Sequence, residues 1–363
     1  MNIDSIIITN KKNKYIIIFY FFCFFCGVSF CDSQPTLPTD MHEMALNVIE
    51  FVFMEKFKYA EEEAKKIIKK YPHHPAGYFF YATSLEALMN YYETTKREEE
   101  FYKFCDIAIE KAENLLAKNK DDDWALFFLG GADGIKGTYE FRNEKWITSF
   151  RHGWKGVSNL LELKKKNPQI IDVNFGIGTY DYWRSSMTKV LWWMPGMENR
   201  STQGIEELYE SAKNGIYTRI SSYANLVTIL NNEKRFAEAL AIAEEMLEKY
   251  PKNIRFLLGK AIALYGEQKF YEAEPIFRYI LSRVESESFD NHYNAILCHL
   301  WLAKIYLETK RYTLCLAECN RISYYKLDDE VKQRIEKYFA EVNKIKAKAN
   351  NAIIRTQEQD VLP

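Results

Sequence analysis

From residue 41 onward, apolar residues recur at the spacing of a helix face through most of the chain. In the segment 223–230, for example, Tyr223, Leu226 and Leu230 fall on one side of a helix. No segment alternates apolar and polar residues in the manner of a β-strand. The pattern therefore predicts an all-α fold.

The helical pattern itself repeats in the second half of the chain. Phe236 and Phe270 are 34 residues apart, and each begins a similar amphipathic segment. Three positions after Phe236 stands a small residue, Ala239, and Cys315 takes this place in a third copy. A small residue lets two helices approach closely, whereas the aromatic ring fills the space between repeats. Two helices per unit of 34 residues are the signature of tetratricopeptide repeats.

The same pattern extends back to residue 41, so we expect an α-solenoid of about seven antiparallel helix pairs, a tetratricopeptide-like superhelix with a C-terminal capping helix. The expected organisation is a signal sequence (1–30), a tether (31–40), N-terminal repeats (41–120), enlarged middle repeats rich in glycine and aromatic residues (121–217), regular C-terminal repeats (218–326), a capping helix (327–350) and a disordered tail (351–363).

Four glycines lie within FLGGADGIKG, residues 128–137, and suggest a phosphate loop at first sight. That loop needs a lysine directly after its last glycine and a strand before it, and this segment has neither. Gly130, Gly134 and Gly137 instead share one helix face, and we predict that they allow two helix backbones to pack closely. Gly176 is assigned the same role, and Lys136 is expected to be dispensable for stability.

The middle block also carries a family resemblance in FLGGA (128–132), in the glycine- and leucine-bearing segment 150–161 and in FGIGTYDYW (175–183). It resembles exported bacterial tetratricopeptide proteins and, more distantly, the tetratricopeptide-39 proteins of eukaryotes. The general repeat resemblance covers residues 41–325, and the more specific one covers 121–186. It implies a scaffold or helper protein and no particular activity.

The N-terminus is predicted to direct export. Lys11, Lys12 and Lys14 precede an uncharged apolar run of 16 residues, 15–30, which is shorter than the roughly 20 residues of a spanning helix. A cleaved signal sequence fits best, and an uncleaved anchor is the alternative. Cys31 is a candidate for lipidation, although Phe30 is larger than the residue usual before a lipidated cysteine. The expected location is periplasmic or, as a lipoprotein, membrane-anchored.

The charge balance gives no general reason to expect nucleic-acid binding. The net charge is −1, and it becomes −3 once residues 1–30 are removed with their three lysines and one aspartate. We therefore expect membrane association only through the N-terminal tether, and the oligomeric state stays open. No nucleophile, metal-binding or cofactor motif occurs in the sequence, so we predict a non-enzyme without a cofactor.

Aromatic residues of the middle block and polar residues of the inner helices are the candidates for partner contact, because tryptophan and tyrosine dominate binding hot spots. The candidates are Trp154, Tyr180, Trp183, Trp193, Asn225, Arg255, Trp301 and Lys304. They predict a concave groove for a protein or peptide. The alternative is a small-molecule or glycan binder with an aromatic pocket in the middle repeats.

Overall fold

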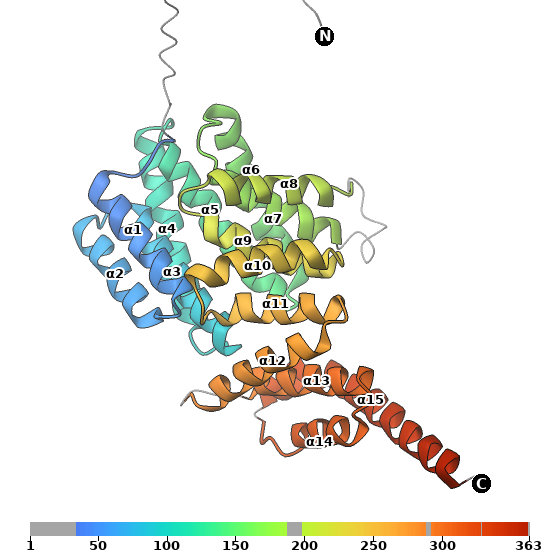
Figure 1. Cartoon of the computed structure of the whole chain (residues 1–363). Helices are drawn as coiled ribbons and strands as arrows, with labels where there is room; N and C mark the ends of the chain where they lie inside the picture. Colours follow the sequence, from blue (N-terminus) through green and yellow to red (C-terminus); the bar gives the residue numbers. More distant parts are fainter. Residues whose placement is uncertain (1–33, 187–197, 288–291, 328, 362–363) are drawn as a thin grey trace, which may run out of the picture. The chain divides into compact units, whose positions relative to one another are not determined.

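The computed structural model describes residues 34–186, 198–287, 292–327 and 329–361. Fifteen helices and no strand occur among these residues (Figure 1). The all-α prediction is therefore confirmed. Residues 34–363 form one compact unit, divided from residues 1–33. In the described part, no helix is both long enough and apolar enough to cross a membrane.

The first fourteen helices form seven consecutive pairs, and the fifteenth caps the stack, as the repeat pattern predicts. The helices are α1 (Thr39–Phe53), α2 (Phe57–Lys70), α3 (Pro75–Tyr92), α4 (Glu98–Lys118), α5 (Asp123–Arg142), α6 (Trp146–Lys166), α7 (Val173–Ser186), α8 (Ser201–Asn214), α9 (Arg219–Asn232), α10 (Phe236–Lys249), α11 (Ile254–Gly266), α12 (Phe270–Glu285), α13 (Tyr293–Glu308), α14 (Tyr312–Ile322) and α15 (Asp329–Val361). Odd-numbered helices up to α13 are the first helices of the pairs, and even-numbered helices are the second helices.

One turn geometry joins the two helices in five of the pairs. A single residue of the turn adopts a left-handed backbone, with φ between 57° and 61° at Glu55, Glu144, Lys234, Gln268 and Lys310. The second helix then begins two residues later on an aromatic residue: Phe57, Trp146, Phe236, Phe270 or Tyr312. A left-handed backbone costs a residue with a β-carbon about 1–2 kcal/mol, so the packing of the following helix has to stabilise the turn.

The small residue three positions into the second helix is buried as predicted. Ala60, Ala239, Ala273 and Cys315 all have no exposed surface. In α6 this position is Ser149, whose hydroxyl donates to the carbonyl oxygen of Gly137 at 2.8 Å. Cys315 is thus a packing residue of the repeat.

Successive first helices pack against one another from α1 through α11. No comparable packing joins successive second helices within the described part. The first helices therefore lie on the inner, more crowded side of a curved stack, as in other helical solenoids. We call the surface that they share the inner face.

The first pair also contacts α10, α11 and α12, from which it is separated by about 200 residues. Asn253 donates its side-chain amide to the carbonyl oxygen of Phe53 at 2.9 Å, and Arg283 pairs with Glu55 at 2.6 Å. Burial raises the pKa of the Glu55 carboxyl, and the Ile254 N–H and Arg283 only partly oppose this shift. These contacts hold the early repeats against the late ones.

Both ends of the described chain differ from the sequence prediction. Helix α15 continues to Val361, so the disordered tail expected from residue 351 is wrong. At the other end, Leu37 is buried and its N–H donates to the Tyr217 hydroxyl at 3.0 Å. Gln34 bonds the Asp172 carboxylate at 2.7 Å. The predicted tether (31–40) is therefore packed from Gln34 onward.

Glycines bring α5 and α6 into close contact. A β-carbon on Gly137 would lie 2.8 Å from the backbone nitrogen of Gly153, and one on Gly130 would lie 2.9 Å from the carbonyl oxygen of Gly156. A β-carbon on Gly156 would in turn lie 2.7 Å from both the Gly130 oxygen and the Gly134 nitrogen. The packing role predicted for Gly130 and Gly137 is confirmed.

Gly134 does not share this role. A β-carbon there would meet no heavy atom within 4 Å, because it would point away from the crossing. Only its backbone nitrogen and α-carbon face Gly156, so the prediction that the close packing of the two backbones requires glycine at position 134 is wrong. At Gly176, a β-carbon would collide with the Leu160 side chain, which agrees with the predicted packing role.

Candidate binding surfaces

A ladder of hydrogen bonds links three successive first helices. The Arg255 guanidinium of α11 donates to the Asn225 side-chain oxygen of α9 at 2.7 Å. The Asn225 amide donates in turn to the Thr179 hydroxyl of α7 at 3.0 Å. We call Thr179, Asn225 and Arg255 the inner-face ladder. Two of these three residues were predicted to contact a partner, and the structure brings them together.

A second polar pair continues this arrangement to the earlier repeats, where Arg142 of α5 donates to the Glu86 carboxylate of α3 at 2.9 Å. Both side chains act electrostatically on Arg255. Arg255 is exposed to solvent as a residue, although neighbouring protein atoms surround its guanidinium. Burial is the largest effect and lowers the pKa of its guanidinium. The negative charge of Glu86 opposes this shift, whereas the positive charge of Arg142 adds to it.

Trp301 and Lys304 are engaged within the chain. The Trp301 ring is half-buried and stacks on Phe277 at a centroid distance of 5.5 Å. The Lys304 ammonium lies 4.3 Å from the Trp301 ring centroid and pairs with Glu341 of α15 at 2.8 Å. These contacts correct the prediction that both residues are free to bind a partner, because Lys304 pairs with the capping helix and the Trp301 ring packs on α12.

Trp183 is also half-buried, with its ring 5.4 Å from Phe141 and 5.1 Å from Tyr182. It therefore contributes to packing between α5 and α7. Trp154 is different, since 54% of its surface is exposed. Its ring lies 6.5 Å from that of Tyr180, which is half-buried against Gly153. Among the predicted aromatic contacts that the structure describes, Trp154 is the most accessible.

Trp154 belongs to a group of exposed apolar side chains on α6. The group, which we call the α6 outer face, consists of Trp146, Ile147, Phe150, Trp154 and Leu161. No other helix in the described ranges exposes more than two large apolar residues. The aromatic residue that opens α6 is more exposed than its counterparts Phe57, Phe236, Phe270 and Tyr312. Of these five residues, only Trp154 was predicted from the sequence to contact a partner.

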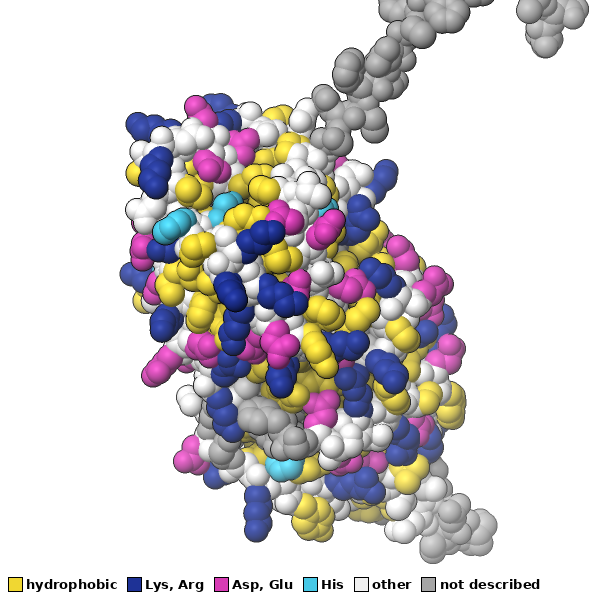
Figure 2. Space-filling model, turned by 90° about the vertical axis from the view of Figure 1, so that its left-hand side faces the viewer, with side chains coloured by type: hydrophobic (Ala, Val, Ile, Leu, Met, Phe, Trp, Pro, Cys, Tyr) yellow, Lys and Arg dark blue, Asp and Glu magenta, His cyan; other side chains and the backbone are white. Residues whose placement is uncertain are grey.

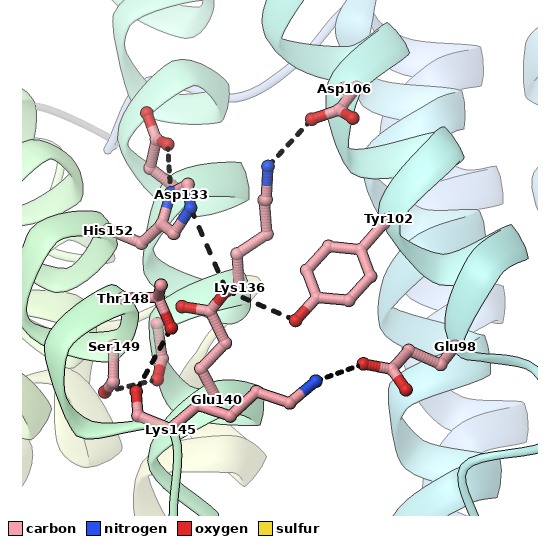
Figure 3. A network of polar contacts seen from close by, with 11 residues as sticks. Glu98, Tyr102, Asp106, Asp133, Lys136, Glu140, Lys145, Thr148, Ser149 and His152 are labelled. Carbon is pink, nitrogen blue, oxygen red and sulfur yellow. Dashed lines mark hydrogen bonds and ion pairs between the residues drawn. The ribbon is translucent and has the colours of Figure 1, made fainter. Parts of the chain in front are cut away.

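A buried polar network joins α4, α5 and α6 (Figure 3). His152 lies 3.2 Å from Asp133 through Nδ1 and 3.9 Å from Glu140 through Nε2, so it stands between two buried carboxylates of α5. The Tyr102 hydroxyl donates to Glu140 at 3.2 Å. Burial, followed by the Glu140 charge, raises the pKa of that phenol. These groups were not singled out in the sequence, because carboxylates at helical spacing resemble a solvated face.

Lys136 belongs to the same network and pairs with Asp106 at 2.8 Å, with only 8% of the residue exposed. The prediction that it is dispensable for stability is therefore corrected. The Ser149 hydroxyl donates to the Gly137 carbonyl, so it is not directed at His152 as a nucleophile would be. The network accordingly serves to join neighbouring repeats.

Other candidate chemistry finds little support among the described residues. No cluster of three or more His, Cys, Asp or Glu residues in this part could hold a metal ion. A hollow of about 470 Å³ lies between α14 and α15 and is lined by Tyr312, Lys348 and Arg355. It is separate from the aromatic middle block in which the alternative predicts a small-molecule pocket.

Two of the predicted residues, Cys31 and Trp193, lie outside the described residues.

The charge balance gave no reason to expect nucleic-acid binding, and the distribution of charge can be inspected on one face of the molecule. Figure 2 views the left-hand side of Figure 1, where α1 and α2 lie, and basic and acidic side chains are interspersed on this face. The face shows no large field of one sign.

Seven stacked helix pairs, the aromatic and small positions of the 34-residue unit, and a shared inner face define a helical-repeat scaffold of the tetratricopeptide type. No protein-family model matches the sequence, and no curated protein matches it. A thermophilic TPR protein of Thermus thermophilus is 15% identical, with a TM-score of 0.40 over 62% of this chain and 99% of that one. A tetratricopeptide repeat protein from Parabacteroides merdae is 12% identical, with a TM-score of 0.37 over 86% of this chain and 99% of that one.

Proposed function

We propose that the chain is an exported, non-catalytic scaffold that binds a protein or peptide partner along its inner face. The observation that carries this proposal is the inner-face ladder, which crosses three repeats and ends in Arg255, a residue that is exposed to solvent. An arginine has five N–H donors. Asn225 is its acceptor among the described residues, so donors are left for the carbonyl or carboxylate oxygens of a partner.

The spacing of the first helices suits a polypeptide better than a compact ligand. Packed helices lie about 8–10 Å apart, so the ladder and the Glu86–Arg142 pair present polar groups at intervals along the inner face. An extended peptide advances about 3.3 Å per residue, so roughly three of its residues span the distance between neighbouring first helices. The helices are already fixed by their own packing, which limits the ordering entropy that opposes binding.

Selection of peptides from a displayed random library against the purified protein tests this proposal. Selected peptides should bind the Arg255→Gln variant about tenfold more weakly, as expected when a charged hydrogen bond is lost. Arg151→Gln, which changes an exposed arginine of α6, is the matched control and should leave binding unchanged. Equal binding by both variants, or failure to select any peptide, would contradict the proposal.

Export is a separate part of the proposal and has its own test. Fractionation of a tagged full chain should recover it from the envelope or the medium. If Cys31 is lipidated, Cys31→Ala should move the protein from the membrane fraction to the soluble fraction. Recovery of the intact, full-length chain from the cytoplasm would refute export without affecting the peptide-binding proposal.

A further inference from the structure

The α6 outer face has the composition of a helix that lies on a membrane surface. Its exposed members are two tryptophans, a phenylalanine, an isoleucine and a leucine, with exposed fractions from 38% at Phe150 to 87% at Ile147. Helix α6 also contains five lysines and arginines and one acidic residue, Glu162. Tryptophan and phenylalanine beside basic residues are typical of helices at the bilayer interface.

Two basic residues lie where they can accompany the apolar ones. Arg151 is exposed and follows Phe150 in the sequence. Three of the other basic residues of α6 are paired within the fold: Lys155 with Asp133, Lys164 with Glu207 and Lys166 with Asp123. Lys165 is exposed near the end of the same helix. Arg151 and Lys165 form no ion pair among the described residues, which leaves both charges available to anionic headgroups.

The described chain begins near one end of α6. Gln34, its first residue, is bonded to Asp172 in the turn that follows the lysine-rich end of this helix.

We propose that, in addition to the N-terminal tether expected from the sequence, the α6 outer face docks on the surface of an anionic membrane, with its aromatic side chains among the headgroups and Arg151 and Lys165 beside the phosphates. At about 1.5 Å per residue, α6 is roughly 30 Å long. The inner face is then free for a partner, so this contact is additional to peptide binding and independent of it.

The test uses the full chain in vesicles of phosphatidylglycerol and phosphatidylcholine whose acyl chains carry bromine, which quenches tryptophan emission on contact. Ile147→Trp places a new tryptophan on the α6 outer face, and Tyr324→Trp places one at a site that is 82% exposed on another part of the fold. The added emission of Ile147→Trp should be quenched and shifted to shorter wavelength. That of Tyr324→Trp should be unchanged, and Trp154→Phe should reduce the quenchable fraction of the wild-type emission.

Two further outcomes decide against the proposal. Added emission that is unquenched at both positions, or equally quenched at both, would refute specific docking of α6. A blue shift of Ile147→Trp without vesicles, together with dimers in sedimentation that Trp154→Ser abolishes, would show that the surface binds a second copy of the chain and not lipid. Peptide binding to the inner face, measured without vesicles, should be the same in all of these variants.

Discussion

Two glycines in α5, one turn apart, are predicted to respond in opposite directions to the same substitution. Alanine at either position removes the helix-propensity penalty of glycine, which is about 1 kcal/mol. At Gly134 the new methyl group meets no atom within 4 Å, so the whole gain should appear as stability. At Gly137 the methyl group would lie 2.8 Å from the Gly153 nitrogen and 3.1 Å from its α-carbon.

The atoms that oppose a methyl group at Gly137 all belong to the backbone of α6, including the Ser149 carbonyl oxygen at 3.1 Å. They cannot rotate away as a side chain can, so the two helices must separate. Overpacking of this kind costs about 1–3 kcal/mol. Because the propensity gain is common to both variants, the difference in unfolding free energy between Gly134→Ala and Gly137→Ala measures the packing cost alone. It should be about 1–3 kcal/mol in favour of Gly134→Ala.

Equilibrium unfolding in urea, followed by helical circular dichroism, measures this difference. The two variants should have the same slope with denaturant, which shows that the same structure unfolds in each. Gly156→Ala, which places its methyl group against the α5 backbone, should behave like Gly137→Ala. Equal midpoints for Gly134→Ala and Gly137→Ala, or a lower midpoint for Gly134→Ala than for the wild type, would refute the assignment of the α5–α6 crossing.

Four further predictions concern single sites. Lys136→Ala should destabilise the fold by about 1 kcal/mol in urea unfolding, because it removes the ion pair with Asp106 and the packing of the lysine stem. Cys315→Ala should cost less than about 1.5 kcal/mol, whereas Cys315→Leu should cost about 1–3 kcal/mol by overpacking a fully buried site. Gln268→Gly should raise the free energy of unfolding by about 0.5–1 kcal/mol, because glycine adopts φ of 61° without strain. The His74 ring accepts the Ala76 N–H at the start of α3, and burial lowers the pKa of this histidine below its usual 6.5. Its contribution to stability should therefore be complete above pH 6.5 and be lost as the pH falls from there through the lower folded pKa; His74→Asn, which keeps a capping acceptor, should flatten this part of a stability–pH profile.

The sequence was sufficient to predict the helical repeat, because the repeat is determined by local and periodic features. Phe236 and Phe270 begin α10 and α12, and Ala239 and Cys315 occupy the buried small site, as their spacing predicts. The left-handed turn residue two positions before each aromatic was not predicted, because lysine and glutamine do not signal that backbone conformation as glycine does. A comparison of the turns across repeats could have found it.

The repeat pattern of the sequence did not predict contacts between repeats that are far apart along the chain. Nothing in residues 53–55 shows that Phe53 and Glu55 will meet Asn253 and Arg283, because the meeting depends on the small rotation that each repeat adds to the next. The same holds for Gly134 and Gly137. Helical spacing puts both on one broad face, but the direction in which α6 crosses α5 decides which of them needs to be glycine.

The α6 outer face departs from the pattern of the other second helices. A second helix of this fold normally buries its opening aromatic between repeats, as α2 does with Phe57, which is 8% exposed. Trp146 is 44% exposed in the equivalent position, and Ile147 beside it is 87% exposed. The α5–α6 crossing is closed by backbone contacts between glycines. Trp146 adds an edge contact with Phe141 at 5.3 Å and still leaves 44% of its surface exposed. Large apolar residues gathered on the exposed side of one helix are better explained by a surface that they contact than by the repeat itself.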